Sequence, residues 1–375
     1  MQHYKDWQET KLSGRYIHLN HIQPLLSQLN SPFSIKELGQ SVEQRPIHAV
    51  YFGQGKHRIM MWSQMHGNES TTTKALFDLF SYIRKFKNST QVINLLDSCT
   101  FLVIPMLNPD GAYRYTRNNA VDIDLNRDAL AQNQPESQIL RSAFEEFKPE
   151  FCFNLHGQRT IYGFKATQTP SVLSFLSPSA DEGRSITLSR KPAMAVIATI
   201  FESLKEELPD RIGRYDDAYN LNCTGDYFQN QNVPTILFEA GHSPDDYMRE
   251  VTRKYIFKSL LVACNTIIKQ DFSNHKTYFD IPEHQNCYVD ILVINVKTEK
   301  DEACKHIAIQ YIEELQDEEV IFLPVVQDIT TENNYIGHQI IDAKGFTVVT
   351  LKDRPIEVNT SVSGVKIGTR STITF

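Results

Sequence analysis

The chain has 375 residues, 41% hydrophobic and 22% charged, and its 38 Lys and Arg against 45 Asp and Glu give a net charge of −7. This acidic balance disfavours general binding to nucleic acid or anionic membranes, and the length exceeds the ~250–300 residues at which single cores stop growing, which predicts two domains. The polar N-terminus lacks a signal-like apolar core and no apolar stretch reaches ~18 residues, which predicts a soluble, cytoplasmic protein.

From Ile47 to Gly241, short apolar runs alternate with longer amphipathic ones, which is typical of an α/β domain with a mixed twisted sheet sandwiched by helices. We predict strands at Ile47–Gly53, Arg58–Met65, Cys99–Leu107, Glu150–Leu155 and Pro234–Ala240. We predict helices at Glu69–Lys87, Glu136–Phe147, Lys191–Glu207 and Asp246–Lys269. This domain is expected to span residues 1–275, with residues 1–45 as an N-terminal extension packed on it.

The first polar motif follows the predicted strand Arg58–Met65. His66 and Glu69 stand three residues apart in a tight turn before a helix, at a strand's carboxyl end, where open α/β sheets bind ligands. A nitrogen and an oxygen ligand at this spacing can converge on one metal ion, and Gly67 gives the backbone freedom to turn between them. Alone, the motif equally fits a surface His before a helix whose first turn favours an acidic residue.

A polar loop follows the strand Cys99–Leu107. It opens with the turn sequence Asn108-Pro109-Asp110-Gly111 and carries Arg114, Arg117 and Arg127 across the end of the sheet. Because arginine binds a carboxylate through paired hydrogen bonds, these residues beside a metal site would form a local anion pocket. The alternative is that each arginine pairs with an aspartate of the same loop.

A second His follows the strand Glu150–Leu155. His156 precedes Gly157 just as His66 precedes Gly67, so two His and one Glu are available as the three protein ligands of a catalytic zinc, with a fourth position left for water. The six cysteines lack the spacing of a structural zinc site and are expected to be free and mostly buried. The sequence therefore predicts one catalytic zinc ion bound by His66, Glu69 and His156.

A carboxylate ends the strand Pro234–Ala240. Burying Glu239 there is costly unless it has a charged partner or a chemical role, and a zinc site supplies both, which predicts Glu239 as the general base. His242, shortly after it, is interpreted as an ordinary polar residue at the start of a loop.

The pattern of apolar and polar residues changes after Tyr278. Asn286–Val296 and Val320–Gln327 are predicted strands around a predicted helix, Lys300–Glu314, and the tail alternates apolar and polar residues. We expect residues 276–375 to form a smaller C-terminal α+β or mostly β module of unknown role.

These segments resemble, in their order, the zinc carboxypeptidase family. The likeness runs from about Tyr51 to His242 and rests on H-x-x-E, N-P-D-G, D-L-N-R, a later strand-terminal His and a strand-terminal Glu. It implies zinc bound by His66, Glu69 and His156, with Glu239 as the base.

The resemblance also implies roles for the polar loop and for a tyrosine. Asn126 and Arg127 would bind the substrate's terminal carboxylate, and Arg117 would polarise the scissile carbonyl. Family members place a mobile tyrosine about twenty residues before the base; Tyr219 is favoured over Tyr215 for this position. The specificity-setting position would lie around Cys223–Asp226, where Asp226 could face a basic substrate side chain or the scaffold.

The expected activity is removal of a C-terminal residue from a peptide with a free carboxylate. An alternative is a zinc-dependent N-acyl amino acid deacylase similar to the succinylglutamate desuccinylase and aspartoacylase group, which shares the H-G-N-E turn, the D-L-N-R segment and a strand-ending Glu. A third possibility is a noncatalytic peptide-binding relative, which the intact set of ligands and base speaks against. No nucleic-acid or membrane partner is expected, and the oligomeric state stays open.

Overall fold

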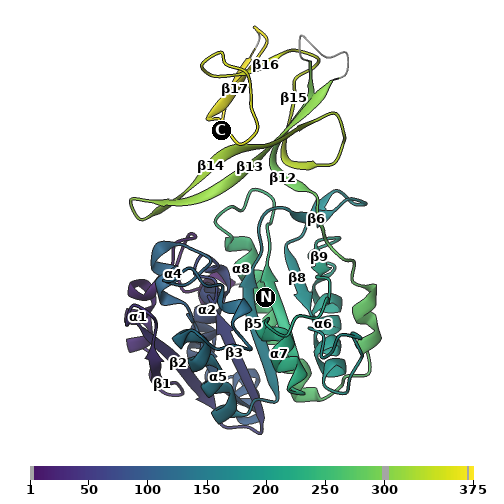
Figure 1. Ribbon diagram of the computed structural model, residues 1–375. Coiled ribbons are helices and arrows are strands. Elements are labelled where there is room, and N and C mark those ends of the chain that lie inside the picture. Colours follow the sequence, from purple (N-terminus) through teal and green to yellow (C-terminus); the bar gives the residue numbers. More distant parts are fainter. Residues whose placement is uncertain (1–3, 298–303, 370) are drawn as a thin grey trace. The chain divides into compact units, whose positions relative to one another are not determined.

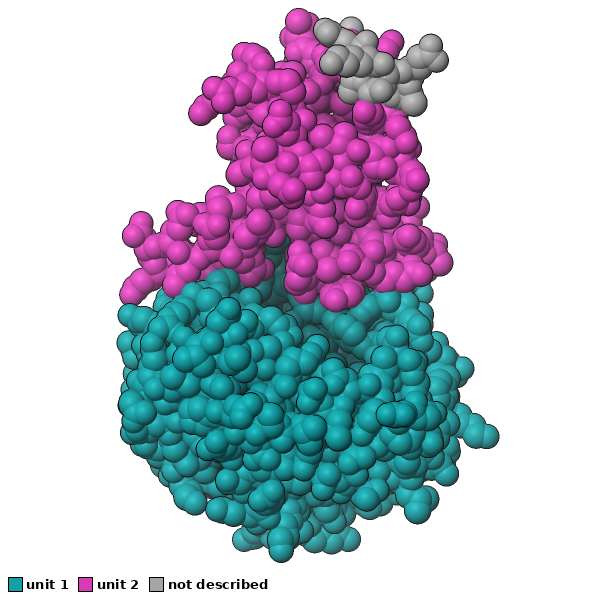
Figure 2. Space-filling view, in the orientation of Figure 1, with its two compact units in different colours: residues 1–158, 171–284 teal, residues 159–170, 285–375 magenta. Residues whose placement is uncertain are grey.

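The computed structural model describes residues 4–297, 304–369 and 371–375. It divides into two compact units: residues 1–158 with 171–284, and residues 159–170 with 285–375 (Figure 2). Within the described ranges, no helix is both long and apolar enough to cross a membrane.

The first unit is built on one mixed sheet (Figure 1). In spatial order its strands are β1 (Ser34–Gln40), β2 (Pro46–Gly53), β4 (Cys99–Ile104), β3 (His57–Ser63), β5 (Phe151–Gly157), β10 (Thr235–Ala240), β8 (Leu173–Leu176) and β9 (Ile212–Arg214). The central strands β4, β3, β5 and β10 run parallel to one another, and β9 runs parallel to β8. The pairs β1–β2, β2–β4 and β8–β10 are antiparallel.

Helices cover both faces of this sheet (Figure 1). They are α1 (Leu19–Ser27), α2 (Thr71–Lys85), α3 (Thr90–Ser98), α4 (Pro109–Arg114), α5 (Pro135–Phe147), α6 (Arg190–Leu204), α7 (Thr224–Asn230) and α8 (Glu250–Lys269), with 3-10 turns η1 (Tyr4–Asp6), η2 (Leu125–Arg127) and η3 (His275–Asp280). Along β3, Ile59 and Met61 join the core under α2, α3, α6 and α8, while Met60 and Trp62 join the core under α5 and α7. This alternation between two buried faces confirms the predicted sheet sandwiched by helices.

The register of the central strands sets the place of the site. Glu239 on β10 pairs directly with His156 on the neighbouring parallel strand β5, and Leu155 pairs with Ser63 at the end of β3. Because in-register residues on parallel strands project to the same face, Glu239 and His156 emerge side by side at the carboxyl ends of the strands.

A buried arginine of α8 binds both α2 and the N-terminal segment. Arg253 and Asp78 are fully buried, with Nε to Oδ2 at 2.7 Å and Nη2 to Oδ1 at 2.6 Å. The same guanidinium donates to the carbonyl oxygens of Leu12 at 2.6 Å and Glu9 at 2.8 Å. One side chain therefore joins α8, α2 and the N-terminal segment.

Replacing Arg253 by Ala is expected to destabilise the first unit by about 3–5 kcal/mol, since Asp78 would be left as an uncompensated buried charge. The free energy of unfolding in urea measures this effect. Lys269→Ala, which changes an exposed cation in the last turn of the same helix, serves as the control. Equal stabilities for the two variants would contradict the role given to Arg253.

In its described residues, the second unit consists of β-strands in three small sheets. These are β11 (Gln285–Asn286), β6 (Tyr162–Phe164) and β7 (Thr169–Pro170); β14 (Glu319–Thr330), β13 (Lys305–Gln316), β12 (Tyr288–Val296) and β15 (Ile336–Asp342); and β16 (Val348–Thr350), β17 (Gly364–Ile367) and β18 (Ser371–Thr374). The β6–β7 hairpin belongs to this unit although it follows β5 in the chain. Buried Asp290 helps to hold the hairpin, because it accepts hydrogen bonds from Thr160 Oγ1 at 3.3 Å and Tyr311 N at 2.7 Å.

The predicted helix Lys300–Glu314 is wrong over residues 305–314, which lie in β13; residues 300–303 fall outside the described ranges. β13 pairs with β14 along its whole length and with β12 over its first half. Glu313, Glu314 and Leu315 favour helix in isolation, but cross-strand pairing of a segment that carries Ile307, Ile309 and Ile312 overrides that local preference.

Candidate metal centre

The turn after β3 presents two of the predicted ligands. His66 lies between the end of β3 and the start of α2, and Gly67 packs so closely on the neighbouring loop that a Cβ there would lie 1.9 Å from the carbonyl carbon of Gly111. Asn108 fixes the turn, because its Nδ2 donates to Met65 O at 3.1 Å while its Oδ1 accepts from Gly111 N at 2.8 Å. The H-G and N-P-D-G motifs therefore fold against each other.

The three predicted ligands converge on one point. Nδ1 of His66 and Nδ1 of His156 each lie 2.9 Å from a carboxylate oxygen of Glu69, and the two ring nitrogens are 3.1 Å apart. Both imidazoles are buried, and one ligand atom from each residue lies within 4.8 Å of the others. Two imidazole nitrogens and a carboxylate facing one another form the donor set that catalytic zinc prefers.

Burial and neighbouring charges shift the pKa values of the three candidate ligands. Burial would raise the pKa of Glu69, but the adjacent His66 and His156 hold it well below its usual value. Burial would lower the pKa of His66, yet Glu69 and Asp124 raise it, whereas burial dominates at His156 and lowers its pKa. The lowered pKa values of Glu69 and His156 favour an ionised carboxylate and a neutral imidazole, which are the forms that bind a metal, while the raised pKa of His66 reflects its two carboxylate neighbours.

Glu239 adds a second carboxylate beside this cluster. Burial, and then the charge of Glu69, raise its pKa well above the usual value. Among the described residues, its buried Oε2 has no hydrogen-bond partner, and the same holds for Nε2 of His156. Buried polar atoms are normally paired, so a carboxylate oxygen without a donor next to three metal-type ligands fits a site built for a cation and its water.

The comparisons with known proteins agree with this geometry. The family model described as zinc carboxypeptidase matches residues 19–266. The chain belongs to the zinc carboxypeptidase family. Membership confirms the predicted family, the class of zinc metallohydrolases and the expected zinc cofactor.

Individual relatives in this family are distant. Carboxypeptidase 2 of Trichophyton tonsurans is 28% identical over 102 residues, covering 27% of this chain and 19% of the relative. Carboxypeptidase D of Mus musculus is 26% identical over 169 residues, covering 39% of this chain and 12% of the relative. The matches thus span a fifth or less of these curated relatives.

Solved carboxypeptidase structures share the fold. A metallo-carboxypeptidase from Burkholderia cenocepacia is similar with a TM-score of 0.54 at 20% identity, covering 68% of this chain and 69% of that one. Carboxypeptidase A from Helicoverpa armigera gives a TM-score of 0.53 at 15% identity, covering 72% and 79%. At these identities the likeness shows a common fold.

Asp124 is a residue of the centre that the sequence did not single out. Its Oδ1 accepts from Nε2 of His66 at 3.1 Å, and its Oδ2 lies 3.1 Å from both Nε and Nη2 of Arg117. A hydrogen bond at Nε2 fixes the tautomer of His66 so that the lone pair of Nδ1 faces the ligand cluster. Its place in the D-L-N-R segment is the available signal, although the sequence alone suggests for an acidic residue of this loop only a pairing with one of the arginines.

Asp124→Asn is expected to lower zinc affinity about 10- to 100-fold, because partners of this kind orient the ligand and raise its basicity. Competition for zinc against a coloured chelator measures the change. Asp122→Asn is the matched control, since Asp122 is exposed in the same loop and accepts from Asn118 Nδ2 at 2.7 Å. Wild-type affinity in Asp124→Asn would show that His66 needs no such partner.

The arginines of the loop have different partners. Arg114 pairs with Glu43, away from the ligands. Arg117 pairs with Asp124, and its Nη1 lies 3.5 Å from Oε1 of Glu69. The structure thus places Arg117 at the edge of the ligand cluster and leaves Arg114 on the scaffold.

Arg127 contacts neutral atoms, the carbonyl oxygen of Asn126 at 2.8 Å and the sulfur of Cys223 at 3.1 Å. In the part of the chain that the structure describes, no carboxylate is paired with it. Oδ1 of Asn126 accepts from Thr224 N at 3.0 Å. The positive charge of Arg127 is therefore available to an anionic ligand.

The two candidate tyrosines lie on the segment after β9. Tyr219 is half-buried with its hydroxyl 3.4 Å from Asn230 Nδ2, while the hydroxyl of Tyr215 donates to Gln158 Oε1 at 3.0 Å. Neither hydrogen bond joins a metal ligand, so the role of Tyr219 stays a prediction.

Asp226 on α7 is buried, and burial raises its pKa to about 7. His242 is buried against the ring of Tyr247.

Proposed function

We propose that the protein is a metallocarboxypeptidase that hydrolyses the amide bond next to the free C-terminal carboxylate of a peptide. The observation that carries this proposal is the pairing of Glu239 with His156, which puts a proton acceptor beside the ligand cluster. Arg127, with its charge available, supports recognition of a chain terminus.

In the proposed reaction each residue has one task. His66, Glu69 and His156 would hold zinc, which when bound supplies a Lewis acid that acidifies water and polarises a carbonyl. Glu239 takes the proton from the attacking water and passes it to the leaving amine, a role that its raised pKa favours. Arg117 donates to the carbonyl oxygen as negative charge develops on it.

Asn126 and Arg127 restrict the reaction to the end of a chain. The planar guanidinium of Arg127 can donate two parallel hydrogen bonds to a carboxylate, and Asn126 adds a side-chain amide. A substrate bound in this way presents its last amide bond to Glu239, so binding energy from the terminus positions the reacting bond.

Matched substrates test the proposal. The zinc-loaded protein is incubated with a peptide acid, the same peptide as its C-terminal amide, and N-acyl amino acids, and products are identified by mass spectrometry. Release of the last residue from the peptide acid alone is the expected result. Hydrolysis of N-acyl amino acids without peptide turnover would replace the proposal by the deacylase alternative, and no turnover of any substrate would favour a noncatalytic peptide-binding protein.

Arg127→Ala is expected to raise KM for a peptide acid about 10- to 100-fold with a smaller effect on kcat, since hydrogen bonds to a charged group contribute about 1.5–3 kcal/mol. Initial rates over a range of peptide concentrations measure both constants. Arg114→Ala is the matched control, because this arginine of the same loop pairs with Glu43. A KM that is unchanged in Arg127→Ala would remove this residue from substrate binding.

A further inference from the structure

The sulfur of Cys223 touches the residue that we propose as the carboxylate anchor. Its Sγ lies 3.1 Å from Nη1 of Arg127, and the next residue, Thr224, donates its backbone N–H to Oδ1 of Asn126 at 3.0 Å. Two consecutive residues at the start of α7 therefore contact both members of the Asn126–Arg127 pair. Cys223 and Arg127 are 96 positions apart in the chain.

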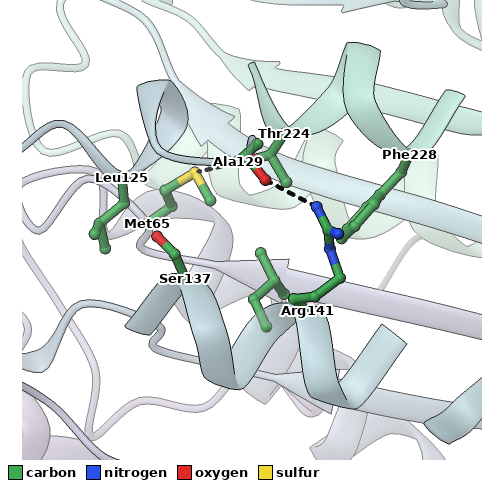
Figure 3. A pocket seen from close by; sticks show the side chains of 8 residues that line it. Met65, Leu125, Ala129, Ser137, Arg141, Thr224 and Phe228 are labelled. Carbon is green, nitrogen blue, oxygen red and sulfur yellow. Dashed lines mark hydrogen bonds between the residues drawn. The ribbon is translucent and has the colours of Figure 1, made fainter. Parts of the chain in front are cut away.

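The backbone around Cys223 is held firmly. Cys223 N donates to Asn220 O at 2.8 Å, and Asn222 O accepts from Ala129 N at 3.2 Å. Thr224, directly after it, is buried and packs on Met65. Thr224 and Phe228 of α7 line a cavity together with Leu125, Met65 and Ser137 (Figure 3). The volume of this cavity is only about 10 Å³, which leaves space for no more than about one water molecule.

The hydrogen bonds of Cys223 N and Asn222 O and the buried side chain of Thr224 fix the backbone from which the sulfur projects. These backbone contacts fix the position of Cys223. The exposed guanidinium of Arg127 therefore contacts a sulfur whose residue is held in place by the surrounding structure.

A thiol suits this position because it is a weak acceptor without charge. Burial raises the pKa of Cys223, although Arg127 opposes the rise, so the group stays a neutral thiol near pH 7. A carboxylate at the same place would pair with Arg127 through strong charge-assisted hydrogen bonds and would compete with an anionic ligand. The sulfur can orient the guanidinium and leave its charge available.

We propose that Cys223 is a positioning residue that holds the guanidinium of Arg127 for the substrate's terminal carboxylate without neutralising its charge. The inference rests on the proposed function, because it assigns to Arg127 the binding of that carboxylate. It adds the residue directly before α7 to the proposed substrate-binding pair on η2, and it gives a reason for a half-buried free thiol beside the site.

A matched pair of variants separates charge from packing. Asp and Asn have nearly the same shape and both favour the N-cap position that Cys223 occupies, so neither should disturb the start of α7. Cys223→Asp is expected to raise KM for a peptide acid about 10-fold or more with kcat little changed, whereas Cys223→Asn stays within a few-fold of wild type. A packing defect would raise KM equally in both.

A second pair tests the positioning contact itself. Cys223→Ala removes the acceptor and is expected to raise KM several-fold, and Cys223→Ser, which restores a neutral acceptor, is expected to return KM toward wild type. Thermal melting of all four variants verifies that they fold.

Equal KM values for the Asp and Asn variants, or an Ala variant that matches wild type, would overturn the inference while wild-type peptidase activity persists. Absence of that activity in the wild-type protein would instead refute the proposed function on which the inference rests.

Discussion

Glu239→Gln is expected to lower kcat for a peptide acid by about 10²- to 10⁴-fold, the usual contribution of a general base, and to leave zinc binding intact. Gln keeps the shape of Glu but cannot accept the proton. The residue lies beside His156 in the sheet register, and its Oε2 has no hydrogen-bond partner among the described residues, so the substitution removes no hydrogen bond of that oxygen there. Steady-state kinetics together with zinc content measure the two effects.

Glu202→Gln is the control for that substitution, because it makes the same chemical change at an exposed position of α6 whose partner is Lys205. A Glu239→Gln protein that turns over at the wild-type rate would refute the assignment of the base. A protein that loses both zinc and activity would show instead that Glu239 is needed to hold the metal.

His156→Ala is expected to abolish stoichiometric zinc binding and the stabilisation that zinc provides. A metal that binds only the folded state stabilises it by RT ln(1 + [L]/Kd), about 2.7 kcal/mol at 100 times Kd. Addition of zinc to metal-free wild-type protein should therefore raise Tm, whereas His156→Ala should show no shift. Calorimetry with and without zinc gives this result independently of any substrate.

The control for metal binding is His57→Ala. His57 stands at the opposite end of β3 from the ligand turn and pairs with Glu150 at 3.0 Å, so its loss should leave the zinc-dependent shift in Tm unchanged. An undiminished shift in His156→Ala would mean that zinc binds elsewhere.

The sequence singled out the candidate metal ligands because each follows a simple local pattern. His66 follows an apolar strand and precedes a Gly, and His156 repeats that arrangement. Parallel strands bring their carboxyl ends to one edge of a sheet, so residues at those ends can meet without knowledge of the strand order. The central strands and the four long helices of the first unit were found for the same reason, since their apolar periodicity is strong.

What the sequence did not predict depends on contacts between distant segments. The register that puts Glu239 beside His156 follows from the order of β5 and β10, which no local pattern encodes. The bond from His66 to Asp124 joins residues 58 positions apart, and that from Arg127 to Cys223 spans 96. The prediction of a helix in the segment that forms β13 is wrong for a related reason, because pairing with β12 and β14 outweighs the helix preference of its polar half.

The most direct test of the central claim is hydrolysis of a peptide acid by the zinc-loaded protein in water labelled with heavy oxygen. Attack by a water that Glu239 deprotonates, on an amide bond placed by a terminal carboxylate, predicts a product one residue shorter with one heavy oxygen in its new carboxyl group. Mass spectrometry reads chain length and label together. Cleavage within the peptide, or a product without the label, would contradict the account.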